Sequence, residues 1–197
     1  MNKKIDFSIY ESEIKNKLSQ KRYYHSMQVA AQARALAEKY GADKDKAYLA
    51  GMLHDIMKEV SYEDTLKYCD ENGIKLTKLE RNTYKILHGI AGADYIRQNC
   101  NINDVDIINS VRYHVTARAG MSLLEKIIYL ADFTSDDRDF DGVDNLRAAV
   151  QININVGMQA ALAFSIKELL DKGNCYIHPN TIEAYNDVME SVLQNQA

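Results

Sequence analysis

Five histidines are spread along the chain, at His25, His54, His88, His114 and His178. His54 is followed directly by Asp55, so this pair offers an imidazole and a carboxylate, which together suit a borderline or harder divalent metal. A metal held in this way activates a bound water while other coordination positions stay open. Successive helical side chains diverge by about 100°, so other helices must supply the remaining ligands. His25 and Asp132 are suitable suppliers.

Each of these features is weak when taken alone. A lone histidine on an apolar helix face is usually a hydrogen-bonded core or surface residue, and a His-Asp pair occurs often by chance. Asp132 strengthens the metal interpretation, because it follows the apolar run Ile127–Ala131, where a buried carboxylate needs a partner such as a metal. The alternative is an aspartate at a helix end that faces solvent.

Helical periodicity predicts the elements that carry these residues. Residues 21–40 form one amphipathic helix ended by Gly41, and Asp43 caps a second helix that places His54-Asp55 in its middle and not in a loop. Ser61 opens another helix that Gly73 ends, and two capping boxes follow, Thr77 with Glu80 and Ser122 with Glu125. Further helices are expected over 103–114, 144–172 and 181–193.

One segment conflicts with this all-α prediction. Val150–Val156 alternates apolar and polar residues with a period of two, which alone predicts a strand. Its flanks are helical, and a lone strand would leave its backbone groups without partners. We therefore expect this segment to continue the long helix over 144–172.

Composition limits the protein to a few classes. The 197 residues suit a single domain, with 46% apolar residues and one proline, as in a compact helical protein. A formal net charge of −4 gives no broad attraction to phosphate backbones, so nucleic acid is not an expected partner. No apolar stretch approaches the roughly 18 residues of a membrane span, and no secretory h-region follows the N-terminal lysines.

The three cysteines predict neither a disulfide framework nor a paired-cysteine metal site. Cys69, Cys100 and Cys175 are odd in number and widely spaced, which favours a reducing cytoplasm. We therefore expect a cytoplasmic protein without membrane association. A homodimer is left open.

The order of the candidate ligands resembles a known signature. His25, then His54-Asp55, then Asp132 is similar to the H…HD…D pattern of the HD-domain superfamily. More narrowly, the sequence resembles the bacterial YqeK-type family of symmetrical diadenosine tetraphosphatases over roughly residues 20 to 190. The matching motifs are Lys21-Arg22-Tyr23-Tyr24-His25, His54-Asp55-x-x-Lys58, His88-Gly89, Tyr113-His114-x-Thr116-x-Arg118-Ala119-Gly120-Met121, Glu125-Lys126-Ile127-x-Tyr129-Leu130-Ala131-Asp132 and Ile177-His178-Pro179.

This resemblance implies an HD-domain helical bundle with its core at about 20–140 and C-terminal helices that complete a nucleotide pocket. It implies a divalent metal held by His25, His54, Asp55 and Asp132, with iron as the first choice and manganese or another transition metal as alternatives. A second metal on His88 and His114 is left open. The implied phosphate-contacting residues are Arg22, Lys58, His88, His114 and Arg138. Taken alone, Lys58 or Arg138 would be read as surface charge.

The implied nucleoside-binding segment comprises Cys175, Tyr176, Ile177, His178, Pro179, Asn180 and Thr181. Gly173 ends the preceding helix and Pro179 disfavours helical geometry at His178, so Tyr176 to Asn180 is expected to be an irregular connection. Free backbone groups there could hydrogen-bond a base edge, while Tyr176 or His178 could stack on its face. An ordinary linker between helices is the alternative.

The sequence departs from the family at two places. The family's usual glutamate-proline pair before the arginine is absent, and residues 133–138 read Phe-Thr-Ser-Asp-Asp-Arg. Val115 and Ala117 replace the commoner threonine and glycine beside His114. These changes leave the candidate metal ligands in place and put the substrate preference in question.

The expected reaction is the symmetrical hydrolysis of diadenosine tetraphosphate, or of a related dinucleoside polyphosphate, to two nucleoside diphosphates. Asp55 is the candidate base, and His88 and His114 would bind phosphate or protonate the leaving group. Two alternatives remain: an HD-family nucleotidase or phosphatase acting on mononucleotides, and a nucleotide or metal sensor that binds without turnover. Retention of every matched ligand argues against the sensor.

Overall fold

A computed structural model describes residues 5–173 and 176–194, and this part of the chain contains helices and no strand. The helices in order are α1 Phe7–Lys17, α2 Gln20–Tyr40, α3 Lys44–Leu53, α4 Tyr62–Glu71, α5 Lys78–Arg81, α6 Tyr84–Asn99, α7 Val105–Tyr113, α8 Leu123–Thr134, α9 Val143–Ile152, α10 Ile154–Asp171 and α11 Pro179–Gln194. The predicted all-α fold class is confirmed.

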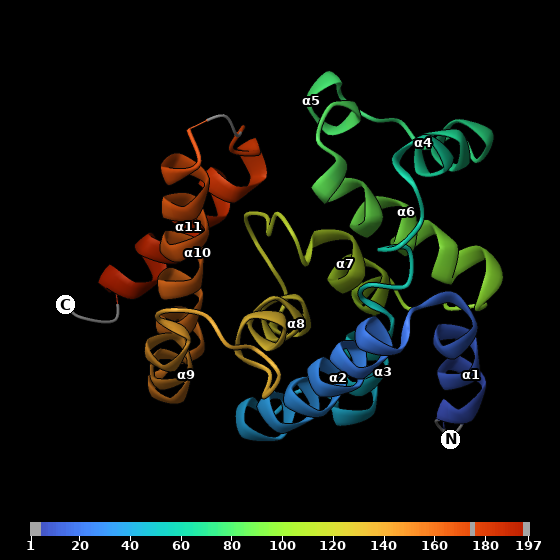
Figure 1. The fold of residues 1–197 in the computed structure, drawn as a ribbon. Coiled ribbons are helices and arrows are strands. Elements are labelled where there is room, and N and C mark those ends of the chain that lie inside the picture. Colours follow the sequence, from blue (N-terminus) through green and yellow to red (C-terminus); the bar gives the residue numbers. More distant parts are fainter. Residues whose placement is uncertain (1–4, 174–175, 195–197) are drawn as a thin grey trace.

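Helix α8 lies at the centre of the arrangement, between α9–α11 on one side and the remaining helices on the other (Figure 1). It contacts α2, α3, α7, α9 and α10. Its apolar residues are therefore buried on nearly every face, including Ile127, Ile128, Tyr129 and Leu130. The packing brings the ends of α3 and α7 close to α8, which also carries Asp132.

The predicted capping signals act as expected. The Asp43 side chain accepts hydrogen bonds from the first turn of α3, and Gly41 ends α2 in the left-handed conformation at φ 77°. Both predicted capping boxes form, at Thr77 with Glu80 and at Ser122 with Glu125. These local signals place the starts of α3, α5 and α8 and the end of α2.

The prediction that His54-Asp55 lies in the middle of a helix is wrong. Helix α3 ends at Leu53, and residues 54–59 form successive turns. The His54 Nδ1 atom lies 2.7 Å from the carbonyl oxygen of Gly51, so the side chain satisfies a carbonyl at the helix end. The turns give the two side chains directions that a continuous helix would not allow.

The predicted long helix over 144–172 is also wrong, because it is two helices joined at Asn153. This residue is extended, at φ −162° and ψ 147°, and its side chain accepts a hydrogen bond from the backbone N–H of Asn155. Asparagine thus caps α10 directly after α9 ends. The period-two pattern of Val150–Val156 marks this break, and no strand forms there.

The terminal helix begins earlier than predicted. Pro179 and Asn180 belong to its first turn, so the expected irregular connection covers only Tyr176, Ile177 and His178 among the described residues. Proline is favoured at the first helical position because its fixed φ suits the helix and the missing N–H would have no helical partner. Cys175 lies outside the described residues.

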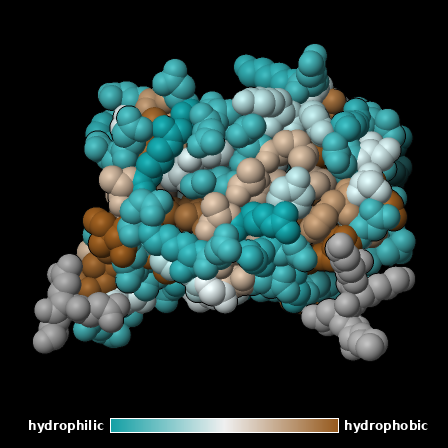
Figure 2. Space-filling model, turned by 90° about the horizontal axis from the view of Figure 1, so that it is seen from below, coloured by the Kyte–Doolittle hydropathy of each residue, from teal (hydrophilic) through white to brown (hydrophobic). Residues whose placement is uncertain are grey.

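The surface is largely hydrophilic when viewed from below, with apolar residues in separate patches (Figure 2). The most exposed large apolar side chains come from different helices, Ile9, Val105, Ile152 and Leu170 among them. None of the described helices is long and apolar enough to cross a membrane.

Candidate metal and phosphate site

Five helices or helix ends converge on one cluster of imidazoles and carboxylates. His25 comes from α2, His88 from α6 and Asp132 from α8, while His54 and His114 close the ends of α3 and α7. Residues that were far apart in the sequence thus become neighbours.

Two glycines allow the helices to approach closely enough. A Cβ atom on Gly51 would lie 2.8 Å from the Cα of Ala30, so glycine lets α3 pack directly on the α2 backbone. A Cβ atom on Gly89 would lie 3.1 Å from the carbonyl oxygen of Arg112, at the contact of α6 with α7. The first contact brings His25 near His54, and the second brings His88 near His114.

One half of the cluster surrounds Oδ2 of Asp55. His54 Nε2 lies 3.4 Å from this oxygen, and His25 Nε2 lies 4.0 Å from it. Oδ1 of Asp132 lies 3.0 Å from His25 Nε2 and 3.7 Å from His54 Nε2. The four residues predicted as metal ligands therefore face one another.

The other half surrounds Oδ1 of Asp55. His88 Nε2 lies 3.1 Å and His114 Nε2 3.5 Å from this oxygen, and the two Nε2 atoms are 3.0 Å apart. One ligand atom each from Asp55, His88 and His114 fall within 4.8 Å of one another, as do those of His25, His54 and Asp55. Asp55 thus offers one oxygen to each half.

The hydrogen bonds of two histidines leave their Nε2 atoms free to coordinate. Nδ1 of His54 donates to the Gly51 carbonyl and Nδ1 of His114 donates to the Val111 carbonyl, each at 2.7 Å, so the Nε2 lone pairs point into the cluster. His54 Nε2 and Asp55 Oδ1 are buried without a hydrogen-bond partner among the described residues. Such buried acceptors are costly unless a cation or donor satisfies them, so the donor set fits a metal ion.

The cluster keeps its carboxylates ionised. Burial would raise the pKa of Asp55, but the imidazoles of His54, His114 and His88 outweigh it and hold that pKa well below its usual range. Burial also opposes ionisation of Asp132, whose pKa is nevertheless held low by His25, His54 and Arg138. Burial lowers the pKa of His88 to about 4 against the opposing effect of Asp55. Neutral imidazole beside ionised carboxylate is the state that coordinates a metal.

The low pKa of His88 predicts a pH-dependent stability of the metal-free protein. Folded His88 stays neutral down to about pH 4, whereas the unfolded residue is protonated below about 6.5. The unfolded state then binds the extra proton, so the free energy of unfolding falls as the pH falls through this window, by about 3 kcal/mol. Denaturant unfolding at several pH values measures the change. His88→Gln should remove most of it, and equal slopes in both proteins would contradict the prediction.

Three cations line the exposed side of the cluster. Arg22 Nη1 donates to Asp55 Oδ2 at 2.8 Å, and Lys58 Nζ lies 3.2 Å from His88 Nε2. Arg138 donates from Nε to the Asp132 carbonyl at 2.6 Å and from Nη2 to Asp132 Oδ1. Their side chains are 28–35% exposed, so they can reach an anion in solvent while they touch the cluster.

Asp137 is a site residue that the sequence analysis missed. Its Oδ2 lies 2.7 Å from Nδ1 of His25, while its Oδ1 accepts a hydrogen bond from Ser135 Oγ at 2.7 Å. The contact directs Nε2 of His25 toward Asp132. A signal for this contact was present in the sequence. Residues 133–138, which include Asp137, lack the glutamate-proline pair that is usual in the family.

Replacing Asp137 with asparagine is expected to lower metal affinity by about 10- to 100-fold, because a histidine ligand loses the carboxylate that fixes its tautomer and raises its basicity. Competition with a chromogenic chelator measures the affinity. Asp136→Asn is the matched control, since Asp136 is exposed in the same loop. Equal metal affinities in the two variants would show that Asp137 is not part of the site.

The hydrogen bonds and ion pairs that link residues 176–181 to the rest of the described chain go to Thr116 and Glu80, and to no residue of the cluster. Thr181 Oγ1 donates to the carbonyl of Thr116 at 2.8 Å, which ties the start of α11 to the loop after His114. His178 and Asn180 line a small cavity of about 60 Å³ with Tyr113 and Thr116. Tyr176 is 71% exposed. The structure places the segment next to the loop that carries His114, and its contact with a nucleoside stays a prediction.

The loop after His114 contains the second departure from the family pattern. Ala117 adopts φ 55°, a left-handed conformation that favours glycine. The alanine is fully buried and packs in the core, so the structure accommodates the strain at this position.

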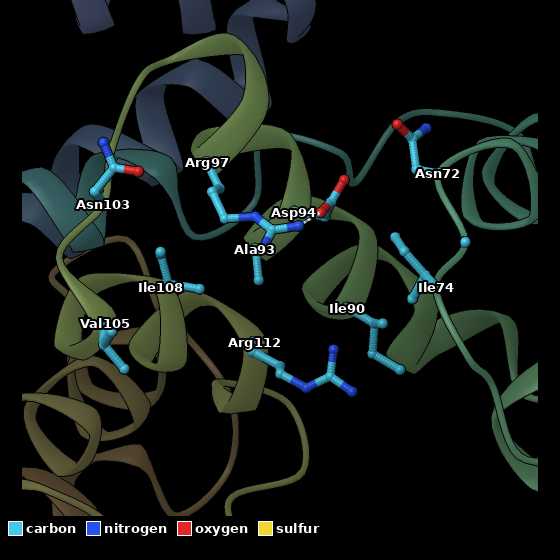
Figure 3. A pocket seen from close by; sticks show the side chains of 11 residues that line it. Asn72, Ile74, Ile90, Ala93, Asp94, Arg97, Asn103, Val105, Ile108 and Arg112 are labelled. Carbon is cyan, nitrogen blue, oxygen red and sulfur yellow. Dashed lines mark hydrogen bonds and ion pairs between the residues drawn. The ribbon is translucent and has the colours of Figure 1, made fainter.

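A larger cavity, of about 450 Å³, is lined by residues of α6 and α7 and of the segments beside them (Figure 3). Its lining includes Ile90, Asp94 and Arg97 of α6 and Arg112 of α7. Asp94 and Arg97 pair with each other at 2.6 Å. No residue of the metal-ligand cluster is among the described residues that line it.

Comparison with known proteins gives the class of this chain. The HD domain family matches residues 22–136, and the chain belongs to this family. Curated relatives named symmetrical bis(5'-nucleosyl)-tetraphosphatase cover nearly the whole chain. The Halalkalibacterium halodurans protein is 35% identical, with 89% of this chain and 93% of the relative aligned. The Staphylococcus aureus protein is 33% identical, with 89% and 87% aligned.

A crystal structure agrees with this assignment. It is described as a predicted HD superfamily hydrolase involved in NAD metabolism from Clostridium acetobutylicum, and it superimposes with a TM-score of 0.91 at 36% identity. The match covers 96% of this chain and all of the other. The helical fold, the family and the class of enzyme, a metal-dependent hydrolase, are thus confirmed.

Proposed function

We propose that this chain hydrolyses diadenosine tetraphosphate, or a related dinucleoside polyphosphate, symmetrically to two nucleoside diphosphates. The observation that carries the proposal is a buried cluster of imidazoles and carboxylates, with unsatisfied acceptors at its centre and three cations at its exposed side. A polyphosphate needs both features, since the cations offset its charge as the transition state develops. The curated relatives that carry the same name support the choice of substrate.

The proposed metal ligands are His25, His54, Asp55 and Asp132. Their mixture of nitrogen and oxygen donors suits a divalent transition metal, and iron, with manganese as the alternative, is the metal that the family resemblance implies. When bound, such a metal polarises a phosphoryl oxygen and lowers the pKa of a water ligand. A second metal would use Oδ1 of Asp55.

The residues of the chain have separate parts in this proposal. Asp55, ionised and facing both halves of the cluster, is the candidate base that accepts a proton from the attacking water. His88, whose pKa is lowered to about 4, would hold phosphate, and His114 would hold phosphate or protonate the leaving nucleoside diphosphate, unless the two bind the second metal. Arg22, Lys58 and Arg138 would fix the phosphates by charge-assisted hydrogen bonds.

Product analysis tests the proposed reaction. Protein purified without oxygen and assayed for metal should convert diadenosine tetraphosphate to ADP alone. Release of AMP and ATP would contradict symmetrical cleavage. Activity confined to mononucleotides would instead support a nucleotidase, and binding without turnover would support a sensor.

We also propose that the protein acts in the cytoplasm. Cys69 and Cys100 are both free thiols, and Cys69 is buried. A reducing compartment keeps such thiols in this state.

Replacing His178 with alanine is expected to raise the Michaelis constant for the dinucleotide while leaving metal content unchanged. His178 lines the small cavity beside Tyr113 and lies outside the metal-ligand groups. Losing one base or ribose contact costs about 1 kcal/mol, or roughly fivefold in the Michaelis constant. Loss of metal in this variant would show that the assignment to the nucleotide is wrong.

A further inference from the structure

A third cavity, of about 220 Å³, opens directly beside the proposed metal ligands. It is lined by Asp132, Phe133, Arg138, Phe140, Phe164 and Glu168, which come from α8, the loop that follows it and α10. The side chain of Asp132 is 19% exposed, whereas those of His25, His54 and Asp55 are 6% exposed or less. The cluster is therefore most accessible on the side of this cavity.

The cavity has an aromatic wall. Three of the four phenylalanines in the chain line it. The rings of Phe140 and Phe164 lie 5.0 Å apart at an angle of 36°, and the Phe133 ring meets Phe164 edge-on at 6.2 Å. All three are only partly buried, so they leave apolar surface in contact with solvent. Exposed aromatic surface beside an arginine suits a planar base attached to a phosphate.

The volume fits a base better than a whole nucleotide. Pockets that enclose a complete small-molecule ligand typically measure about 300–1,000 Å³, and this cavity is smaller. Arg138 contacts Asp132, whereas the Glu168 side chain is 53% exposed and its Oε2 pairs with Lys172 at 3.2 Å. A base inside the cavity would thus have its phosphates directed toward the metal ligands.

We propose that this phenylalanine pocket binds one nucleobase of the dinucleotide, with the base stacked on Phe140 and Phe164 and the adjoining phosphate on Arg138. The inference rests on the proposed function, because symmetrical cleavage requires one nucleoside on each side of the metal ligands. The cavity at His178 shares no lining residue with this pocket and adjoins the cluster through the loop after His114. The two cavities are therefore separate, as two base sites would have to be.

Affinities for ADP and for inorganic tripolyphosphate, measured with the metal-loaded protein, separate base binding from phosphate binding. Phe164→Ala and Phe140→Ala should weaken ADP binding, and raise the Michaelis constant for diadenosine tetraphosphate, by roughly 5- to 100-fold, the usual effect of one lost stacking contact. Tripolyphosphate affinity and metal content should not change. Phe164→Leu keeps apolar volume but removes the ring, so it should show a similar loss.

Phe7→Ala is the matched control, since Phe7 is also partly buried but packs on Tyr48 in another part of the molecule. Three results would each overturn the proposed pocket. They are a loss of ADP affinity in Phe7→Ala as large as in the Phe140 and Phe164 variants, a loss of tripolyphosphate affinity as large as that of ADP affinity, and unchanged ADP affinity in Phe164→Leu. If the wild type fails to cleave dinucleotides while Phe164→Leu selectively weakens ADP, the proposed function fails and the pocket stands. If the wild type cleaves dinucleotides and both phenylalanine variants do so with unaltered kinetics, the proposed function stands and the pocket fails.

Discussion

Replacing Asp55 with alanine is expected to abolish both metal retention and hydrolysis. Asp55 is 2% exposed and faces both halves of the cluster through its two oxygens. Removing it takes a ligand from the metal and leaves the imidazoles without the negative charge that they share. Since a bound metal supplies several kcal/mol of transition-state stabilisation, turnover should fall by at least about 10³-fold.

Metal analysis after gel filtration, together with product formation, measures this effect. Asp55→Asn preserves volume while removing the charge, so it should show the same loss even if alanine disturbs the packing. Asp139→Ala, which removes an exposed carboxylate from the loop after α8, should retain metal and activity. Full metal occupancy in both Asp55 variants would rule out the proposed ligand set. His54→Ala should match Asp55→Ala, because His54 Nε2 is fully buried and directed at the same point.

Most helices could be predicted because their signals are local. Asp43, Ser61, Ser122 and Gly41 act on backbone groups within one turn, so neighbouring residues in the sequence determine where the helix begins or ends. The order of the candidate ligands could likewise be recognised as the H…HD…D motif. The break at Asn153 was not, because an asparagine inside an apolar pattern becomes a cap only when neighbouring helices such as α8 favour two shorter helices over one.

The parts of the site that could not be predicted depend on tertiary contacts. Asp137 meets His25 across 112 positions of sequence, and the loop that carries it is held by Arg147, which donates to the carbonyls of Ser135 and Arg138. The phenylalanine pocket likewise combines α8 and α10 residues that no sequence motif connects. The turn at His54 arises from a side-chain bond to Gly51 that propensity alone does not reveal.

The double variant Lys58→Ala with Arg138→Ala is expected to keep its metal and to lose most of its catalytic efficiency. Neither residue is a metal ligand. Each is positioned for a charge-assisted phosphate contact worth about 1.5–3 kcal/mol, which corresponds to roughly 10- to 150-fold in kcat/KM. They contact different residues, Lys58 at His88 and Arg138 at Asp132, so their effects should be nearly additive and reach about 10²- to 10⁴-fold together.

The measurement compares kcat/KM of both single variants and the double variant with metal content in the same preparations. Lys75→Ala combined with Arg34→Ala removes the same charges from exposed positions elsewhere and should leave kinetics unchanged. Arg138→Lys distinguishes charge from geometry: if Arg138 holds phosphate through its planar guanidinium, lysine should recover only part of the loss. Unchanged kinetics in the double variant would return both residues to the surface-charge interpretation, and metal loss in Arg138→Ala would show that this arginine acts by holding Asp132 in place.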